Sequence, residues 1–234
     1  MYHDYGSLSD QDLTGLYRYP NGPYPNGTVL RANMVASADG AASLGGASAG
    51  LSSAADRHVF ALLRTLADVI VVGANTARVE GYKPVRIREL WRHLRDGRAP
   101  VPPIAVITGR ADLDLASPLF ADQSTIIITT SKAAVKRENV IVAGDTSVDL
   151  AAAMAALRER GHEHILAEGG PGILGQLVTG GLLDELCLTT GPLLAGPGAP
   201  RIVTGSPASK PVPMTLAHIV DDNGFLLCRY TSHN

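Results

Sequence analysis

The stretch that decides the fold is ILAEGGPGILGQLV, residues 165–178, where an apolar strand gives way to a glycine-rich turn and then to a helix. Residues 170–175 have the G-x-G-x-x-G spacing of dinucleotide-binding folds. Glycines in such a turn let backbone amides approach a phosphate at the positive end of a helix. Alternatively, Gly169 and Gly170 only make a tight turn, while Gly172 and Gly175 permit close helix packing. The pattern by itself leaves both interpretations open.

The position of this turn in the chain argues against a Rossmann domain. A Rossmann fingerprint lies in the first strand-to-helix turn, and later units complete the sheet. Here the turn opens the last predicted helix before a terminal hairpin. The next strand, ELCLTTG at 185–191, also ends without the acidic residue that would bind a ribose hydroxyl. If the turn binds phosphate, it does so in another α/β fold.

Strand-like and helix-like segments alternate on the amino-terminal side of this turn. Their pattern predicts strands at 29–37, 68–73, 103–109, 124–130, 139–144, 164–170 and 184–194, and helices at 52–67, 147–161 and 171–181. The last segment, 214–230, predicts a hairpin that turns on Asn223-Gly224. We therefore expect a single-domain α/β protein with a mixed, mostly parallel sheet flanked by helices and a C-terminal antiparallel hairpin.

The start of the first predicted helix and the start of the chain both contain local sequence signals. Ser53 and Asp56 have the spacing of a capping box at the start of the helix. Residues 1–27 are rich in turn signals, with YPNG at 19–22 and again at 24–27. This composition predicts an N-terminal arm over 1–27 and leaves 28–234 as the domain.

Composition limits the class of protein. The 234 residues are 45% hydrophobic and 18% charged, and 20 basic against 22 acidic residues give a formal net charge of −2. Such a balance provides no electrostatic basis for binding nucleic acid. The basic stretch at 86–95 predicts an amphipathic helix with a solvated basic face. No apolar run is long enough to span a membrane, and the first residues do not resemble a signal peptide. We expect a cytoplasmic protein with two reduced cysteines.

Two further turns follow apolar strands and contain glycine with polar neighbours. In the first, Gly73 precedes Asn75 and Thr76, either of which could cap a short helix and bind a phosphate. In the second, Thr108-Gly109-Arg110 ends a strand, and an arginine there could pair with a terminal phosphate. Each turn alone is ordinary turn chemistry, but together they could line one edge of the sheet, where α/β proteins bind ligands.

Three segments together resemble a known family. They are ASADGAAS at 36–43, the segment 45–81 with its G-x-x-T, and the segment 165–196 with its E-G-G-P. In this order they resemble the reductase domain of the riboflavin-biosynthesis deaminase/reductase, from about Val29 to the end. The resemblance implies a fold like that of dihydrofolate reductase and an NADPH-dependent reductase. Its expected substrate is 5-amino-6-(5-phosphoribosylamino)uracil, whose opened ribose is reduced at C1′ to a ribityl chain.

The resemblance also implies roles for particular residues. Ser48, Glu168 and Arg86 would contact the substrate, with Glu168 hydrogen-bonded to amino or amide groups of the pyrimidine. Asp39 takes the position of the aspartate beside the nicotinamide. The expected cofactor contacts, together with those of the three turns, are Ala36, Gly50, Gly73, Thr76, Glu80, Thr108, Gly109, Arg110, Gly169, Gly170, Pro171, Gly172, Ile173, Leu174, Gly175 and Gln176.

The two candidate catalytic residues also have ordinary structural explanations. A carboxylate such as Glu168 just before a helix is stabilised by the helix dipole in any protein. It also ends an apolar strand, where a carboxylate needs hydrogen-bond donors. Asp39 precedes a glycine, which is common turn chemistry. Either carboxylate could donate the proton that accompanies hydride transfer, directly or through water, and the sequence does not choose between them.

Departures from the family pattern keep other functions open. Ala41 stands where the family commonly has lysine, Gly50 where it often has an aromatic residue, and 80–86 reads EGYKPVR. A dihydrofolate or pterin reductase, or a non-catalytic NADPH-binding protein, is therefore an alternative. The zinc-deaminase motif is absent, and His162 and His164 lack a third ligand, so we expect no metal. The apolar segment 182–196 and the resemblance predict a homodimer.

Overall fold

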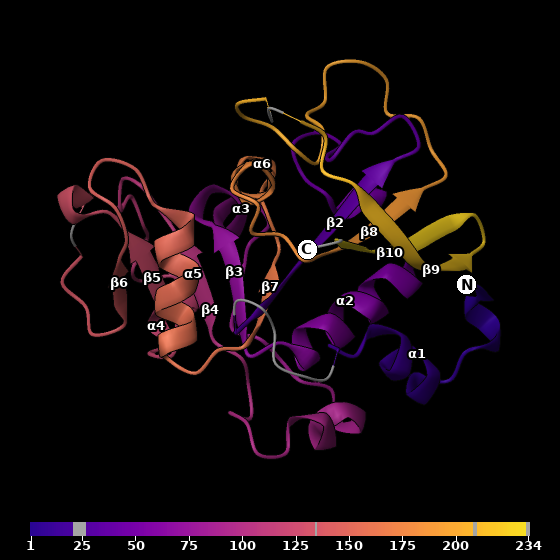
Figure 1. Cartoon of the computed structure of the whole chain (residues 1–234), viewed down its shortest axis with the longest axis horizontal. Coiled ribbons are helices and arrows are strands. Elements are labelled where there is room, and N and C mark those ends of the chain that lie inside the picture. The colour runs from indigo at the N-terminus through magenta and orange to yellow at the C-terminus, as the bar shows by residue number, and fades with distance from the viewer. Residues whose placement is uncertain (21–26, 134, 208–209, 233–234) are drawn as a thin grey trace.

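A computed structural model describes residues 1–20, 27–133, 135–207 and 210–232. Its strands are β1 (Tyr2–Asp4), β2 (Val29–Ser37), β3 (Val69–Gly73), β4 (Ile104–Ile107), β5 (Ile126–Thr129), β6 (Val140–Val142), β7 (His164–Ala167), β8 (Glu185–Gly191), β9 (Met214–Asp222) and β10 (Phe225–Ser232). Within the described ranges they form one ten-stranded sheet in the order β1-β9-β10-β8-β2-β7-β3-β4-β5-β6 (Figure 1). The pairings are parallel except those of β10 with β8 and β9.

The α/β class, the mostly parallel sheet and the antiparallel C-terminal strands are confirmed. The turn between β9 and β10 uses Asn223 and Gly224 at φ values of 52° and 88°, the left-handed conformation that a two-residue hairpin turn requires. The helices are α1 (Asp10–Tyr17), α2 (Ala54–Leu66), α3 (Ala74–Val79), α4 (Pro118–Ala121), α5 (Leu150–Glu159) and α6 (Pro171–Thr179), with short 3₁₀ turns η1 (Tyr5–Ser7), η2 (Ala49–Leu51), η3 (Glu89–Arg95) and η4 (Ser131–Ala133). No helix in these ranges is long and apolar enough to cross a membrane.

The sheet has a hydrophobic core on each face because successive strand residues point to opposite sides. On one face, Ile70 and Val72 pack with α1, α2 and η3. On the other, Val71 packs with α5 and α6. These are fully buried residues of β3, whose near-continuous apolar run is typical of a strand covered on both sides. The parallel strands therefore direct their carboxyl ends to one edge, between the two helical layers.

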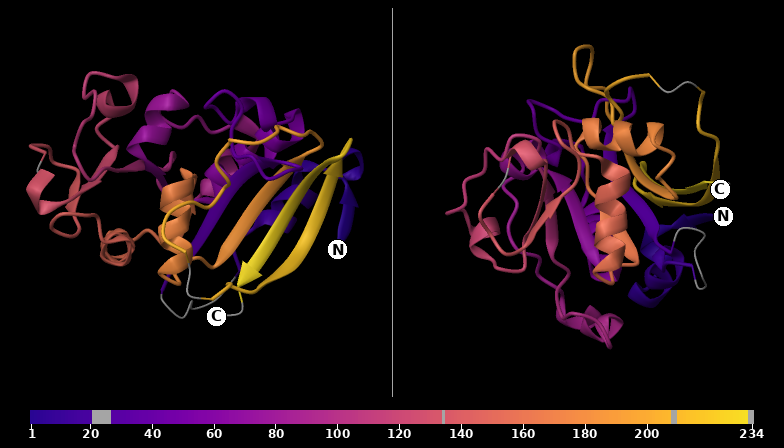
Figure 2. Two further views of the ribbon diagram at one scale, coloured as in Figure 1. Left: turned by 90° about the horizontal axis from the view of Figure 1, so that it is seen from above. Right: turned by 60° about the vertical axis from the view of Figure 1, so that its left-hand side comes forward.

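The N-terminal arm is paired and packed into the domain. Strand β1 lies parallel to β9 at the end of the sheet, as the left view of Figure 2 shows, and Leu13 and Tyr17 of α1 are buried. Arg31 of β2 and Arg229 of β10 donate to the last carbonyl oxygens of α1, and both pair with Glu185. The boundary at residue 28 stays a prediction, and the YPNG residues 21–26 lie outside the described ranges.

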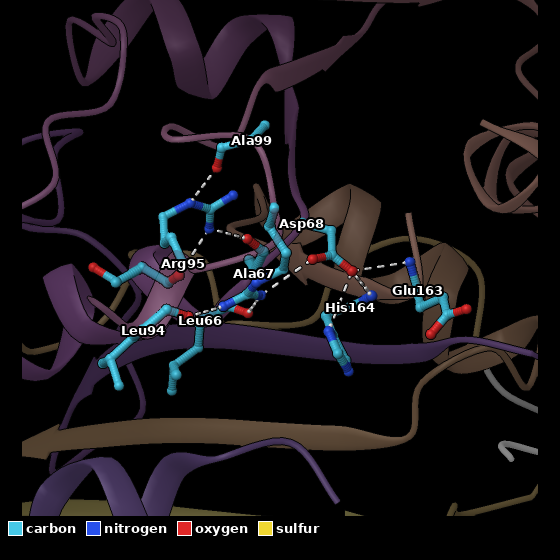
Figure 3. A network of polar contacts seen from close by, with 10 residues as sticks. Leu66, Ala67, Asp68, Leu94, Arg95, Ala99, Glu163 and His164 are labelled. Carbon is cyan, nitrogen blue, oxygen red and sulfur yellow. Dashed lines mark hydrogen bonds and ion pairs between the residues drawn. The ribbon is translucent and has the colours of Figure 1, made fainter. Parts of the chain in front are cut away.

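A polar network holds the end of α2 at the opposite edge of the sheet (Figure 3). Arg95 and Arg98 donate to the carbonyl oxygens of residues 65–67 at 2.7–2.8 Å. Arg98 also pairs with Asp68, which accepts a hydrogen bond from the backbone of His164 at the start of β7. The prediction of a solvated basic helix over 86–95 was wrong in part: η3 is a 3₁₀ helix, and Arg95 is buried because it satisfies these carbonyl groups.

Two predicted helix caps also need correction. The hydroxyl of Ser53 accepts a hydrogen bond from the amide of Asp56, as predicted, but the carboxylate of Asp56 does not complete the capping box. Neither Asn75 nor Thr76 caps α3, because Gly73 is its N-cap and both residues lie within the helix.

Candidate active site

A cleft of about 900 Å³ lies at the carboxyl edge of the sheet. Its walls come from β2 and the loop that follows it, from α2 and α3, from the segment 79–86, and from the start of α6. Strands β7, β3 and β4 are adjacent and parallel, so the turns that follow them meet at this edge. The three turns that the sequence singled out are therefore neighbours, but only the turns after β3 and β7 line the cleft.

The predicted site residues divide into those that line the cleft and those that do not. The cleft wall includes Ser48, Thr76, Glu80, Arg86, Glu168, Gly170 and Pro171. The other predicted residues lie outside the wall: Ala36, Asp39, Gly50, Gly73, Thr108, Gly109, Arg110, Gly169, Gly172, Ile173, Leu174, Gly175 and Gln176.

Glu168 is the buried centre of a hydrogen-bond network in the cleft wall. Its side chain is 2% exposed. Arg64 of α2 binds it with two parallel hydrogen bonds, Nε to Oε1 at 2.7 Å and Nη2 to Oε2 at 2.6 Å. The hydroxyl of Tyr82 donates to Oε2 at 2.7 Å. A bidentate arginine and a tyrosine fix both oxygens of the carboxylate, which supplies the donors that its position at the end of β7 requires.

The same network determines the charges of its members. Burial, and then the negative charge of Glu168, raise the pKa of Tyr82 well above its ordinary value, so the hydroxyl stays protonated and donates. Burial works to lower the pKa of Arg64, but the neighbouring Glu168 raises it above its ordinary value. Arg64 also stacks on the ring of Phe60, with 4.2 Å from its guanidinium carbon to the ring centroid. The network is therefore a fixed ion pair in the wall of the cleft.

The E-G-G-P turn combines close approach with close helix packing. The amide of Gly73 donates to the carbonyl oxygen of Gly169 at 2.8 Å, which joins the turns after β3 and β7. A Cβ atom at Gly170 would lie 2.5 Å from Oγ1 of Thr76, and one at Gly175 would lie 2.0 Å from the carbonyl oxygen of Thr204. Gly170 is thus required at the cleft, whereas Gly175 is required for packing against the segment around Thr204.

Asp39 binds a neighbouring loop instead of the cleft. Its carboxylate accepts hydrogen bonds from the amides of Ala195 at 3.0 Å and Gly196 at 2.8 Å, and from the hydroxyl of Ser37. The Ser37 hydroxyl, followed by these amides, lowers the pKa of Asp39 to about 2. The aspartate therefore connects the loops after β2 and β8 as a carboxylate at neutral pH.

Thr108 also acts within its own turn. Its hydroxyl accepts hydrogen bonds from the amides of Arg110 and Ala111, at 3.4 and 3.0 Å. Gly109 and Arg110 are exposed, and a Cβ at Gly109 would meet no atom within 4 Å. The turn leaves open space beside the cleft at the same edge of the sheet.

Sequence reasoning missed the contribution of α2. Asp56, Phe60 and Arg64 line the cleft at intervals of four residues, which places them on one face of the helix. The carboxylate of Asp56, 8% exposed, accepts hydrogen bonds from the hydroxyls of Thr189 and Ser52. The i, i+4, i+8 spacing was the available signal. The polar residues on it are also typical of an ordinary solvated helix face.

Side chains that could bind a metal ion do not cluster in the described part of the chain. No group of three or more histidine, cysteine, aspartate or glutamate side chains there could hold an ion. His164 instead binds Asp68 in the network at the opposite edge.

Comparison with known proteins identifies the family. A family model described as the RibD C-terminal domain matches residues 28–226. The chain belongs to the RibD C-terminal domain family. The resemblance inferred from the sequence motifs is thereby confirmed. Among solved structures, a pyrimidine reductase-like protein from Corynebacterium diphtheriae is 28% identical with a TM-score of 0.80, and the match covers 98% of this chain and 97% of that one.

Two curated relatives of this RibD C-terminal domain come from archaea. The protein from Archaeoglobus fulgidus is 26% identical over 168 residues, which are 66% of this chain and 76% of the relative. The protein from Methanothermobacter thermautotrophicus is 29% identical over 145 residues, 57% of this chain and 63% of the relative, so less than two thirds of that relative is spanned. Both are named 2,5-diamino-6-ribosylamino-4(3H)-pyrimidinone 5′-phosphate reductase.

Proposed function

We propose that this RibD C-terminal domain is an NADPH-dependent reductase of the ribosyl group of a ribosylaminopyrimidine 5′-phosphate in riboflavin biosynthesis. The motif resemblance implies 5-amino-6-(5-phosphoribosylamino)uracil as the substrate, and the archaeal relatives are named for the 2,5-diamino-4(3H)-pyrimidinone form. The observation that carries the proposal is the convergence of the E-G-G-P turn, Thr76 and the Arg64–Glu168 pair on one cleft.

The turn after β7 fits a dinucleotide. Helix α6 begins at Pro171 in the cleft wall. Pro171 has no amide hydrogen, and the amides of Ile173 and Leu174 donate to the carbonyl oxygen of Gly170, so the turn offers a phosphate the amide of Gly172 and the positive end of the helix dipole. The absence of a side chain at Gly170 keeps this helix start beside Thr76. We assign the phosphates to these groups, and the adenosine end to the open turn of Gly109 and Arg110, where the arginine would pair with a 2′-phosphate. When bound, NADPH supplies the hydride that reduces C1′ of the opened ribose.

The other wall of the cleft fits a substrate that has a phosphate group and a ribosyl carbon, C1′, that is reduced. Lys83 and Arg86 line it as exposed cations that can bind the 5′-phosphate. Three hydrogen bonds from Arg64 and Tyr82 fix the carboxylate of Glu168 and leave about one acceptor position, which can take a hydrogen bond from the ribosyl group near C1′. Glu168 thus stays a catalytic candidate, here as the acceptor of a hydrogen bond instead of the proton donor that the sequence analysis considered.

Asp39 stays a weaker catalytic candidate. Its carboxylate binds the turn at 195–196 outside the cleft wall, and its low pKa leaves no proton to donate at neutral pH. A catalytic contribution from Asp39 would require the loops after β2 and β8 to move toward the cleft together.

Loss of NADPH absorbance on addition of each candidate substrate tests the proposal. Turnover with a ribosylaminopyrimidine phosphate and none with dihydrofolate supports it. The reverse result supports the pterin alternative, and binding of NADPH without turnover supports the non-catalytic one. Glu168→Gln should lower kcat/KM about 100-fold. Glu159→Gln, the same change on the exposed surface of α5, should leave kcat/KM unchanged.

We further propose a twofold homodimer that uses the face of the β8–β10–β9 strands without a covering helix. Leu216 and Leu226 are 42% and 36% exposed there, and Leu186 and Leu188 of β8 are half-buried because they also pack against the core on the side of α5 and α6. Sedimentation at micromolar concentration should give the dimer mass, and a monomer mass would contradict the proposal. The two free buried cysteines fit the reducing cytoplasm, which we propose as the location.

A further inference from the structure

The cleft contains three carboxylates, and they differ in what already binds them. Glu168 has Arg64 as a counter-ion, and three hydrogen bonds occupy its oxygens. Glu80 accepts a hydrogen bond from the amide of Ser48 at 2.8 Å. Asp56 accepts hydrogen bonds only from neutral hydroxyls, and it forms no ion pair with any residue in the described ranges.

Asp56 is also held in place. Thr189 of β8 donates to Oδ1 at 2.7 Å, Ser52 donates to Oδ2, and the backbone of Asp56 lies in the first turn of α2. An ionised carboxylate offers about four acceptor positions, so two remain, one on each oxygen. Only 8% of the residue is exposed, and it lines the cleft. A buried, oriented carboxylate with two unused acceptor positions can accept hydrogen bonds from a ligand in the cleft.

The proposed substrates differ in the donors that they offer. A 2-amino-4(3H)-pyrimidinone has N–H groups at N3 and at the 2-amino group, side by side on one edge, and these match the two oxygens of a carboxylate. The corresponding uracil has N3–H between two carbonyl groups. Its O2 would face a carboxylate oxygen, acceptor against acceptor.

We propose that the carboxylate of Asp56 accepts hydrogen bonds from N3–H and the 2-amino group of the pyrimidine. This contact makes the protein selective for the 2-amino-4(3H)-pyrimidinone form of its substrate. Phe60, one helical turn further along α2, provides apolar surface in the same wall. Arg64 and Glu168 lie one turn beyond, beside the reacting ribosyl group. Helix α2 thus orders the substrate, with its base at Asp56 and its ribosyl group at Glu168. This inference rests on the proposed function.

The test compares the two pyrimidines on each protein. The wild-type kcat/KM should favour the diamino substrate by about 100-fold or more, because a site that hydrogen-bonds an N–H group rejects an analogue that lacks it. Asp56→Asn replaces one acceptor with an amide donor, which matches N3–H and O2 of the uracil. The ratio should therefore fall by at least tenfold or invert. A ratio taken on one sample is independent of the folded fraction of that sample.

Glu80→Gln is the matched control, since it makes the same change in another carboxylate of the cleft. It should alter turnover with both pyrimidines equally and keep their ratio. A wild-type preference for the uracil, or a ratio that Asp56→Asn leaves unchanged, would overturn the role of Asp56. Should neither pyrimidine support NADPH oxidation, the proposed function fails. The ratio of the two dissociation constants, measured by calorimetry on the same proteins, then decides the role of Asp56 separately.

Discussion

Two glycines of α6 are expected to respond in opposite ways to the same substitution. A Cβ at Gly175 would lie 2.0 Å from the carbonyl oxygen of Thr204, whereas ordinary contact begins at 3.4 Å, so these atoms must separate by about 1.4 Å. A Cβ at Gly172 would lie 3.9 Å from the Thr204 side chain, which is ordinary contact. Both glycines have backbone conformations that alanine adopts. Gly175→Ala therefore tests the packing, and Gly172→Ala is its control.

The expected magnitude follows from three contributions. Forcing an extra carbon into a packed contact costs about 1–3 kcal/mol. The shift also endangers the hydrogen bond from the amide of Thr204 to the carbonyl oxygen of Pro171, 3.1 Å long and worth about 1 kcal/mol. Alanine recovers about 1 kcal/mol over glycine inside a helix. Gly175→Ala should destabilise the protein by about 2 kcal/mol, which lowers the melting midpoint by about 4–8 °C in a chain of this size.

Thermal unfolding followed by circular dichroism measures both variants. Gly172→Ala should melt at or slightly above the wild-type temperature, since it gains helix propensity without a clash. Indistinguishable midpoints for the two variants would refute the reasoning. They would show that the segment around Thr204 adjusts to a side chain at Gly175 without cost.

Two other predictions concern buried charge. Arg64→Met leaves the buried carboxylate of Glu168 without its counter-ion and should lower the free energy of unfolding in urea by about 3–5 kcal/mol. Adding Glu168→Leu should restore most of this loss. A double variant no more stable than Arg64→Met alone would contradict the prediction. Burial, and then the positive charge of Arg229, lower the pKa of His218 to about 4 from 6.5, so its contribution to stability is complete above about pH 6.5 and is lost as the pH falls toward 4. His218→Phe should flatten the decline of the unfolding midpoint over this interval, and an equally steep decline would contradict the assignment.

Much of the fold was predictable because its signals are local. The run at 69–73 is apolar throughout, as a strand buried on both faces must be, and Asn223-Gly224 has the backbone preference of a hairpin turn. Strand β1 and helix α1 were missed for the opposite reason. The three residues of β1 pair with β9, more than two hundred positions away, and the short α1 is held by arginines of the sheet. No nearby pattern records such partners.

The candidate site divides in the same way. Glu168 was predictable because a carboxylate at the end of an apolar strand is conspicuous and requires donors. Its donor Arg64 was not, since an arginine in an amphipathic helix already has an explanation on the solvent side. Asp56 was also difficult to recognise as a site residue, because it lies three residues after the capping Ser53. An acidic residue at that position is explained by the capping box, with no need for a ligand. Only the position of α2 in the folded structure shows which of its polar residues line the cleft.

Both outermost strands of the sheet, β1 and β6, are three residues long. At the β6 edge, a strand this short offers few unpaired amides and carbonyls to the strand of another molecule. At the other edge, β1 pairs with residues 219–221 of β9, so only the first residues of β9 stay open on that side. A second copy can therefore extend the sheet sideways over only a short length. Self-association of this chain should therefore stack broad surfaces and give closed, countable assemblies instead of fibres.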